Sequence, residues 1–570
     1  MKERGSRSLA DIERLESEAP FELRLPAHSV WTLVEANEAL DDARPAVSFL
    51  PHGLADETAL TWTRAELKTR ARRFANRLHR LGVAAPEGVA LVMTNRPEFY
   101  PAFLGSQAIA VPCPVSPLLG VEALAGILIA GRCRVMVTEG PSLNPELWQR
   151  ACEAVGLACE SVIVFALGGA GTGMPPNADV HDFEAACGAE SGDALRFAPI
   201  DGLDAQAARF HTGGTTGSPK LAVHSQKNHL HAIWAMGQLV GFHREDVVLV
   251  GLPLFHVHAA IPLGLAPLVE GAHLVLLGPQ GFRHASVMKD FWLIVRRFEA
   301  TVFSAVPAVY AGLLNAPPPG DDIRTLRLAL CGSAPLPAQT ARDFEARCSI
   351  GIVEGYGLTE GTCVSSLNPV AGPRHIGSIG IRLPYQQMKV ARVDDGGRWT
   401  ADCSVGETGV LLIKGPNVFA GYVDSTQNAG AFAAPGWLNT GDLGRVDAEG
   451  YFWITGRAKD LIKRNGHSVD PQGVEEILHS HPAVALAAVV ARPDARAGEL
   501  PVAFVAVRAG AAAKDTELRQ HCVIHGVDPI AMPVDFHVLQ ALPLTAVGKL
   551  DKVRLRSLAA STTLSQGDKP

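Results

Sequence analysis

The chain has 570 residues, of which 47% are hydrophobic and 19% are charged, and its formal net charge is -7. This length exceeds what one hydrophobic core can serve, so two or more domains are expected, and the composition excludes a disordered chain. The mildly acidic balance gives no electrostatic reason to expect nucleic acid as a partner.

The N-terminal residues, the most apolar stretch and the cysteine spacing exclude further classes of protein. Residues 1–20 are polar and charged and lack the apolar segment of a signal peptide. The most apolar stretch, residues 259–279, is interrupted by Glu270, His273 and several Gly and Pro residues, so no integral membrane segment is expected. The ten cysteines form no CxxC pair, which argues against a zinc site and a disulfide framework. These features predict a cytoplasmic enzyme.

Helices alternate with strands through the first two thirds of the chain. Thr63 and Glu66 form a capping box before apolar residues at helical spacing, and Gly82 ends this predicted helix. Short apolar segments bounded by turn residues predict buried strands, and strands that alternate with helices imply largely parallel sheets with both faces covered. The predicted strands are 89–93, 134–138, 161–165, 247–251 and 273–277.

The pattern changes after Gly380, where shorter strands and turn signals at 394–397 and 447–450 predict a small β subdomain. A third region starts near Gly456, and in it Asp470 and Pro471 open a predicted helix. Strands at 484–491 and 502–507, a helix near 517–521 and a strand near Phe536 follow. The prediction is an α/β fold, with a large N-terminal domain of several subdomains and a smaller α+β C-terminal domain.

A stretch dense in Gly and hydroxyl side chains runs from His211 to Lys220. Glycines let backbone N–H groups approach phosphate oxygens closely, hydroxyls add donors and the lysine adds a charge. The spacing of a Walker A loop is absent, so this segment alone leaves phosphate binding and a flexible surface loop equally open.

Three further motifs carry aromatic, acidic or basic side chains that suit a nucleotide. Tyr356 could stack on a purine, while Thr359 and Glu360 could hold a phosphate and Mg2+. Asp442 could accept ribose hydroxyls beside the donors of Arg457. Each has an ordinary structural alternative, namely a strand end, a turn residue or a solvated charge. The motifs are Gly355–Glu360, Thr440–Asp442 with Gly456–Asp460, and Gly548–Lys549.

In this order and at these separations, the motifs resemble the adenylate-forming superfamily of acyl-CoA synthetases, peptide-synthetase adenylation domains and beetle luciferases. The resemblance covers residues 60–556 and is strongest with bacterial acyl-CoA synthetases. It implies an N-terminal extension (1–30), an adenylation domain (31–456), a hinge (457–461) and a mobile C-terminal lid (462–558). Residues 559–570 are expected to form a disordered tail.

The resemblance assigns roles to individual residues. Thr359 contacts the α-phosphate, Glu360 holds Mg2+, His256 lies in the catalytic centre, and Lys549 reaches the carboxylate and the bridging oxygen from the lid. Lys459 matches the hinge, and Gly466 lines the tunnel for coenzyme A. The expected nucleotide-binding residues are Thr212, Gly213, Gly214, Thr215, Thr216, Gly217, Lys220, Gly332, Ser333, Ala334, Gly355, Tyr356, Gly357, Asp442 and Arg457.

The implied reaction is ATP- and Mg2+-dependent adenylation of a carboxylic acid, followed by transfer of the acyl group to coenzyme A. Many relatives have Ser in place of Gly213 and Gly in place of Asn465, which affects loop and tunnel detail rather than charge. The alternatives are a ligase that loads a separate carrier protein and a non-catalytic acyl- or nucleotide-binding protein. Assembly into a homodimer is possible on the sequence alone.

The acyl pocket is expected after His256 and at two strand ends, with an apolar lining. Since no Lys or Arg stands there, a hydrophobic monocarboxylate is favoured, a fatty acid first and an alicyclic or other ring-bearing acid second. The same apolar residues would equally suit a protein core. The predicted pocket residues are Trp234, His258, Ala259, Ser304 and Cys331.

Overall fold

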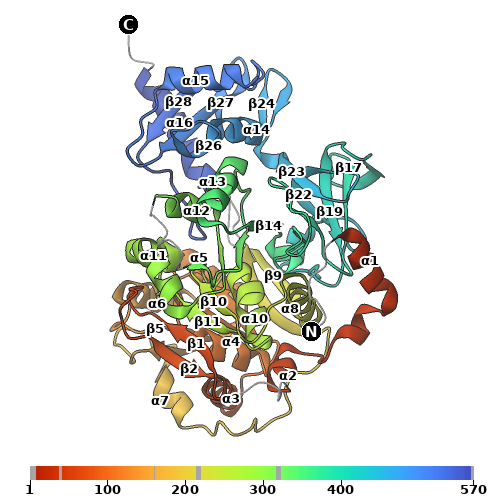
Figure 1. Ribbon diagram of the computed structural model, residues 1–570. Coiled ribbons are helices and arrows are strands. Elements are labelled where there is room, and N and C mark those ends of the chain that lie inside the picture. The colour runs from red at the N-terminus through yellow and green to blue at the C-terminus, as the bar shows by residue number, and fades with distance from the viewer. Residues whose placement is uncertain (1–7, 37–41, 159–160, 213–219, 316–322, 567–570) are drawn as a thin grey trace.

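The computed structural model describes residues 8–36, 42–158, 161–212, 220–315 and 323–566, with side chains up to residue 561. A large body contains the chain up to β23, and a smaller domain, blue in Figure 1, sits on top of it. This arrangement confirms the predicted α/β class and the smaller α+β C-terminal domain. Within the described residues, no helix is both long and apolar enough to cross a membrane.

Two sheets with mainly parallel strands form the centre of the large body. One sheet has nine described strands in the order β16-β15-β14-β13-β12-β10-β11-β1-β2, and the other has five in the order β4-β3-β5-β6-β7. The strands of the first are β1 (Pro45–Phe49), β2 (Leu60–Thr63), β10 (Val247–Val250), β11 (His273–Leu276), β12 (Val302–Ala305), β13 (Leu328–Cys331), β14 (Ile352–Tyr356), β15 (Ser366–Leu367) and β16 (Ile381–Arg382). Those of the second are β3 (Gly88–Val92), β4 (Val111–Val115), β5 (Cys133–Glu139), β6 (Val162–Leu167) and β7 (Ala178–Asp182).

Antiparallel sheets complete the large body and form the centre of the C-terminal domain. A three-stranded sheet joins β8 (Gln206–Thr212), β9 (Lys220–Ser225) and β20 (Gly421–Tyr422). The predicted β subdomain contains β17 (Gln387–Val393), β18 (Trp399–Asp402), β19 (Gly409–Lys414), β21 (Phe432–Ala434), β22 (Trp437–Val446) and β23 (Phe452–Arg457). The C-terminal sheet contains β24 (Ile462–Arg464), β25 (His467–Val469), β26 (Val484–Asp494), β27 (Gly498–Val507) and, parallel to β27, β28 (Asp535–Leu539).

Helices pack around these sheets (Figure 1). The α-helices are α1 (Leu9–Glu18), α2 (Val30–Glu35), α3 (Arg64–Arg80), α4 (Phe99–Gln107), α5 (Val121–Ala130), α6 (Pro145–Leu157), α7 (Phe183–Gly188), α8 (Gln226–Val240), α9 (Val257–Ala260), α10 (Ala266–Val269), α11 (Ala285–Phe298), α12 (Pro307–Leu313), α13 (Ala338–Cys348), α14 (Pro471–His479), α15 (Asp515–Ile524) and α16 (Lys552–Gln566). Short helices of other types are η1 (Phe21–Arg24), η2 (Ile261–Leu265), η3 (Gly281–Arg283), η5 (Thr359–Gly361), η6 (Ser425–Asn428) and η7 (Ala458–Asp460).

Local sequence signals account for several helix starts. The Thr63 hydroxyl accepts the Glu66 N–H at 3.2 Å, and the Glu66 carboxylate accepts the Thr63 N–H at 2.7 Å, so the predicted capping box of α3 is present. The carboxylate of Asp470 likewise accepts the Gln472 N–H at 3.0 Å, with Pro471 in the first turn of α14.

The predicted disordered tail from residue 559 is wrong for its first part. Helix α16 continues to Gln566, and Leu555 and Ala559 are fully buried against β26 and β27. The polar composition of the tail concealed this because only one side of the helix needs apolar residues to pack.

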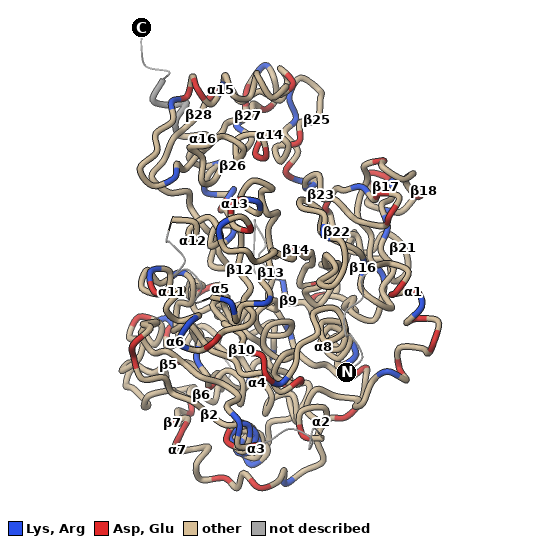
Figure 2. The backbone as a smooth tube through the Cα atoms, in the orientation of Figure 1, with Lys and Arg blue, Asp and Glu red and all other residues tan. Residues whose placement is uncertain are grey.

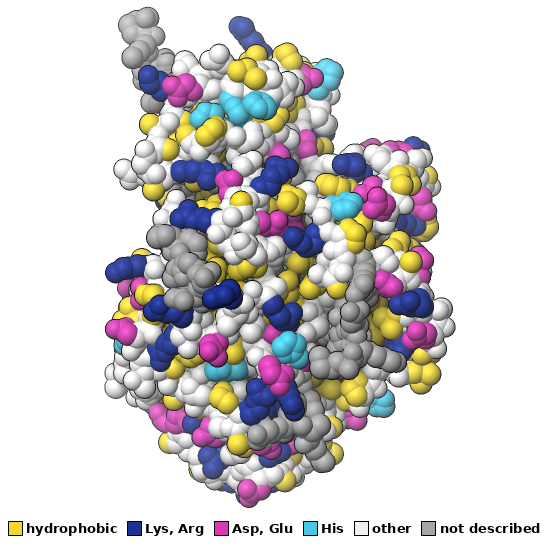
Figure 3. Space-filling view, in the orientation of Figure 1, with side chains coloured by type: hydrophobic (Ala, Val, Ile, Leu, Met, Phe, Trp, Pro, Cys, Tyr) yellow, Lys and Arg dark blue, Asp and Glu magenta, His cyan; other side chains and the backbone are white. Residues whose placement is uncertain are grey.

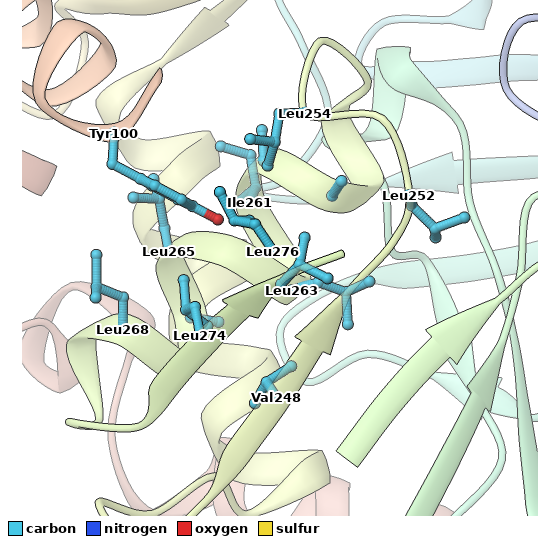
Figure 4. Close-up of a cluster of buried hydrophobic side chains, with 14 of the residues drawn as sticks. Tyr100, Val248, Leu252, Leu254, Ile261, Leu263, Leu265, Leu268, Leu274 and Leu276 are labelled. Carbon is cyan, nitrogen blue, oxygen red and sulfur yellow. The ribbon is translucent and has the colours of Figure 1, made fainter. Parts of the chain in front are cut away.

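The segment after His256 packs as core. In Figure 4, side chains from η2 and α10 lie over β10 and β11, and the ring of Tyr100 from α4 reaches the same cluster. Gly264 permits this contact, because an added Cβ would lie 3.2 Å from the Tyr100 ring. The backbone of the predicted acyl-pocket region is therefore held firmly by the central sheet.

The C-terminal domain contacts the large body through α13 and β23. The Glu476 carboxylate accepts the Ala338 N–H at 3.0 Å, and Arg508 pairs with Asp343 at 2.9 Å. Acidic and basic side chains are interspersed on both domains (Figures 2 and 3). The contacts of Glu476 and Arg508 with α13 fix the orientation of the small domain, and this orientation determines which of its residues face the large body.

Candidate active site

Tyr356, Asp442 and Arg457 form one cluster at the edges of two sheets. Tyr356 ends β14, while Asp442 in β22 lies opposite Arg457 in β23. The Tyr356 hydroxyl donates to the Asp442 carboxylate at 2.6 Å, and the Arg457 guanidinium donates to its other oxygen. A carboxylate accepts up to about four hydrogen bonds, so Asp442 keeps acceptor capacity for the hydroxyls of a ribose.

Burial and the Asp442 charge hold the pKa of Tyr356 well above its usual range. Its hydroxyl therefore stays protonated and continues to donate to Asp442. The aromatic ring is thereby fixed in orientation beside the carboxylate.

Thr359 and Glu360 lie on a tight turn, η5, directly after this cluster. The Tyr422 hydroxyl donates to the Glu360 carboxylate at 2.6 Å, and the Lys220 ammonium lies 4.9 Å from the centre of the Tyr422 ring. Gly357 is required here, because an added Cβ would lie 1.1 Å from the carbonyl oxygen of Cys363. The turn thus brings an acidic side chain close to the start of β9.

The Gly-rich stretch connects β8 to β9. Thr212 and Lys220 are paired residues of these antiparallel strands. Their register brings the two ends of the stretch together, and the Lys220 ammonium approaches the turn of Glu360 through Tyr422. The other predicted phosphate-loop residues lie outside the described residues, namely Gly213, Gly214, Thr215, Thr216 and Gly217.

Lys549 reaches this site from the C-terminal domain. It lies in a turn in which the Thr545 hydroxyl accepts the Lys549 N–H at 3.1 Å. Gly548 has a φ of +81°, and an added Cβ would lie 3.1 Å from Val306 of the large body. Glycine is favoured at such a backbone conformation. The turn is therefore pressed against the large domain, with Lys549 directed into it.

The charges around Lys549 identify its surroundings. Burial lowers the pKa of Lys549, the nearby Arg457 lowers it further, and Asp442, Cys363 and Glu360 act in the opposite direction. Residues of the motifs near positions 360, 442, 457 and 549 thus meet in one place, although two domains contribute them. This meeting is the central feature of the candidate site.

Two histidines lie beside this charge cluster. Burial, reinforced by the Lys549 charge, holds the pKa of His256 well below its usual range and lowers that of His258 to about 4. The His258 ring is hydrogen-bonded to Ser333 at 3.1 Å and to Ser304 at 3.3 Å. Both rings are therefore neutral near pH 7 and offer hydrogen bonds rather than positive charge.

Gly332 and Ser333, two of the residues predicted to bind the nucleotide together with Ala334, lie against the His258 ring. A Cβ added at Gly332 would lie 3.3 Å from the His258 ring and 3.4 Å from the Gly355 carbonyl. Ser333 has a φ of +71°, which is unusual for a residue other than glycine. The close packing fits a wall that approaches a flat ligand.

The predicted acyl-pocket residues separate into two groups. His258, Ser304 and Cys331 are buried together around β12 and β13, and Ala259 belongs to the buried hydrophobic core. The described ring contacts of Trp234 are with Phe21 and Tyr385, at the N-terminal extension. The structure thus brings three of the five residues together beside Ser333, whereas the described ring contacts of Trp234 lie elsewhere.

The predicted hinge and tunnel residues are both exposed. Lys459 is exposed in η7, between the last strand of the large body and the first strand of the small domain. Gly466, in the turn between β24 and β25, is exposed with a φ of +81°, and an added Cβ would meet no described atom within 4 Å. In this arrangement Lys549 faces the large body and Gly466 faces solvent.

Sequence reasoning missed Tyr422, which contacts both Glu360 and Lys220. Its strand, β20, has only two residues and pairs with β9 across a long stretch of sequence. The two residues Gly421 and Tyr422 form no recognisable sequence motif, so only the fold reveals this contact.

Comparisons with known proteins agree with this geometry. The family described as AMP-binding enzyme matches residues 35–423, and the AMP-binding enzyme C-terminal domain matches residues 473–549. Marinolic acid--CoA ligase of a Pseudoalteromonas species is 38% identical over 96% of this chain and 84% of its own length. Long-chain-fatty-acid--CoA ligase of Bacillus subtilis is 33% identical over 66% of each chain.

A solved structure shares the whole architecture. ATP-bound MatB from Rhodopseudomonas palustris superimposes with a TM-score of 0.79 and 26% identity, over 93% of this chain and 99% of its own. The apo form of the same protein gives a TM-score of 0.71. The family match, the relatives named as CoA ligases and the meeting of motif residues near positions 360, 442, 457 and 549 show that the chain belongs to the AMP-binding enzymes of the adenylate-forming superfamily and is an AMP-forming acid–CoA ligase.

Proposed function

We propose that this ligase joins a hydrophobic monocarboxylic acid to coenzyme A in two half-reactions at one site. In the first, a carboxylate oxygen of the acid attacks the α-phosphorus of ATP, and the bond to pyrophosphate breaks. In the second, the thiol of coenzyme A attacks the acyl carbon, loses its proton, and AMP leaves. The observation that carries this proposal is the presence of Lys549 among Asp442, Arg457 and Glu360.

The first half-reaction brings two anions together, which explains the positive groups. Lys549 from the small domain would neutralise the carboxylate and the developing charge at the bridging oxygen. Asp442 and Tyr356 would hold the ribose and adenine, and Thr359 would contact the α-phosphate. The greater similarity to ATP-bound than to apo MatB supports the assignment of this arrangement to adenylation.

Glu360 suits Mg2+ that also binds the phosphates of ATP. Its carboxylate is held by Tyr422 at 2.6 Å. Mg2+ commonly takes one or two protein carboxylates and completes its shell with phosphate and water oxygens. Bound there, Mg2+ would neutralise phosphate charge.

The second half-reaction needs a different face of the small domain. Lys549 lies near Arg457, Asp442 and Glu360 in the present arrangement, and Gly466 faces solvent. Rotation about the hinge at Lys459 would withdraw the lysine and bring Gly466 to the site, where its missing side chain would leave space for pantetheine. The contacts of Glu476 and Arg508 with the large body are polar and partly exposed, so such a rotation could replace them with contacts to water.

A fatty acid is the favoured substrate, and a ring-bearing acid is the second candidate. The pocket side of the site offers neutral His258 and Ser304 rather than a cation for a second carboxylate. A relative named for long-chain fatty acids supports this first choice, and the relative of highest identity described above is named for marinolic acid. A relative named for 4-coumarate keeps the ring-bearing class open.

The proposal is tested by AMP release with purified protein, ATP and Mg2+, coenzyme A, and a panel of straight-chain, aromatic, alicyclic and polycyclic acids. We expect coenzyme A-dependent release with medium- or long-chain fatty acids. Activity confined to ring-bearing acids would replace the first choice with the second. Pyrophosphate exchange without coenzyme A-dependent AMP release would point to a carrier protein as acceptor. No activity in either assay would point to a non-catalytic binding protein.

The pH dependence of the first half-reaction should report on Lys549. Its pKa is lowered by burial and by Arg457, and the protonated ammonium is the form that assists the reaction. Pyrophosphate exchange should therefore fall as the pH rises through this lowered value, earlier than an ordinary lysine near pH 10.4 would allow. Because arginine stays charged throughout this range, Lys549→Arg should lose the alkaline decline, whatever its absolute rate. An unchanged decline in that variant would assign it to another group.

A further inference from the structure

Three buried polar side chains connect α4, α8 and β9 to the backbone of Thr359. Gln107, at the end of α4, is hydrogen-bonded to His229 of α8 at 3.1 Å. His229 is hydrogen-bonded to His224 of β9 at 3.2 Å, and His224 contacts the Thr359 carbonyl oxygen at 2.8 Å. Gln107, His224 and His229 are all shielded from solvent. None of them belongs to the motifs that identified the family.

Gln107, His229 and His224 form a row of hydrogen-bonded side chains. The backbone carbonyls at its two ends fix the position of every proton in this row. The Gln107 amide donates to the Ala207 carbonyl at 2.9 Å, so the same nitrogen is also the donor to Nδ1 of His229. His229 must then carry its proton on Nε2 and donate to Nδ1 of His224. His224 in turn carries its proton on Nε2, which donates to the Thr359 carbonyl.

This row cannot accept an additional proton without losing a link. A proton on Nδ1 of either histidine would face another N–H donor. Burial lowers the pKa of His224 to about 4, and burial together with His224 lowers that of His229 well below its usual range. The rings of Phe103 and Phe210 lie against the imidazoles, at centroid distances of 6.3 Å from His229 and 5.2 Å from His224. The row is therefore neutral and rigid.

The backbone that receives this hydrogen bond carries the predicted phosphate and Mg2+ contacts. The Glu360 carbonyl accepts the Phe419 N–H at 2.9 Å, and the Gly361 carbonyl accepts from the Asn417 amide at 3.1 Å. Three successive carbonyls of the turn thus have partners, one from β9 and two from the loop between β19 and β20. Only the Thr359 carbonyl is tied through side chains to the strand that begins with Lys220.

We propose that His224 and His229 are positioning residues for adenylation, because they fix the turn of Thr359 and Glu360 against the strand that carries Lys220. This inference rests on the proposed function, in which these residues contact the phosphates. It assigns no direct substrate contact to either histidine. A displacement of about 1 Å in such a turn can reduce a rate by up to about a hundredfold.

The test compares His224→Leu with His224→Gln in acid-dependent pyrophosphate exchange. Leucine removes the donor to Thr359, so kcat should fall about tenfold or more while KM for the acid stays unchanged. The glutamine amide can replace the Nε2–H donor, so His224→Gln should recover most of kcat. His229→Leu should give an intermediate loss, since His224 keeps its ring but its proton is no longer fixed.

His231, which lies on α8 two residues after His229, provides a matched control. Its ring is fully buried and donates to the Pro384 carbonyl at 2.8 Å, so His231→Leu removes an equivalent bond away from the turn. Both leucine variants should lower the unfolding temperature, but only His224→Leu should lower kcat. Equal kcat in the two folded variants would overturn the positioning role, as would failure of His224→Gln to recover activity. Absence of exchange in the unsubstituted enzyme would instead refute the proposed function.

Discussion

Replacing Lys549 with alanine is expected to reduce acyl-adenylate formation by about a hundredfold or more, because one pre-placed charge is lost where two anions react. The same variant should form thioester normally when acyl-adenylate and coenzyme A are supplied. The reason is the contrast in the structure, where Lys549 lies among Arg457, Asp442 and Glu360 while the predicted tunnel residue faces solvent. Pyrophosphate exchange measures the first half-reaction, and coenzyme A-dependent AMP release from supplied adenylate measures the second.

Lys514 supplies a control for this experiment. It is an exposed lysine of the same domain, at the start of α15, so Lys514→Ala removes a charge of the same kind from the surface. We expect both half-reactions to keep their rates in that variant. Equal loss of both half-reactions in Lys549→Ala would mean that the lysine serves the structure of the small domain, and the assignment to adenylation would fail.

The sequence was most informative where a function needs several residue types at short spacing. Tyr356, Thr359 and Glu360 stand within five positions, and the structure joins them to Asp442, Arg457 and Lys549. Local signals also predicted the start of α3 through its capping box. Such features depend on neighbours along the chain, so periodicity and motif spacing are sufficient to find them.

Contacts made across long sequence separations could not be predicted in this way. Tyr422 reaches Glu360 from a two-residue strand, and His224 reaches the Thr359 carbonyl across 135 positions. Their residue types are common, and nothing near them in the chain marks them as special. The pairing of β20 with β9 and the packing of α8 create these contacts, so only the assembled fold shows them.

The acyl pocket shows the limit of reading apolar residues. Ala259 follows His256 in a segment that suits a pocket lining or a core, and the structure buries it in the core. Trp234 contacts Phe21, which belongs to the N-terminal extension. Hydrophobicity alone cannot distinguish apolar residues that line a ligand pocket from those that pack in the core. Ligand binding and core packing both gain free energy when apolar surface is removed from water. We therefore leave both residues out of the proposed pocket.

Replacing Gly466 with leucine is expected to block attack by coenzyme A and to leave adenylation intact. In the present arrangement a side chain at this position meets no described atom within 4 Å, so it should not disturb the site that contains Lys549. After rotation of the small domain, the same side chain would occupy the tunnel for pantetheine. Pyrophosphate exchange should keep its rate, while thioester formation should fall by about a hundredfold or more, as expected when the thiol cannot reach its attack position.

Backbone strain must be separated from blockage, since Gly466 has a φ of +81° that a leucine adopts poorly. Gly526 offers the matched control, because it is exposed in the same domain, has a φ of +74°, and also has open space at its Cβ position. Gly526→Leu should therefore lower stability by a similar amount and keep both half-reactions. If thioester formation survives in Gly466→Leu, the tunnel lies elsewhere. If Gly526→Leu loses it as well, strain in the small domain, rather than a filled tunnel, explains the loss.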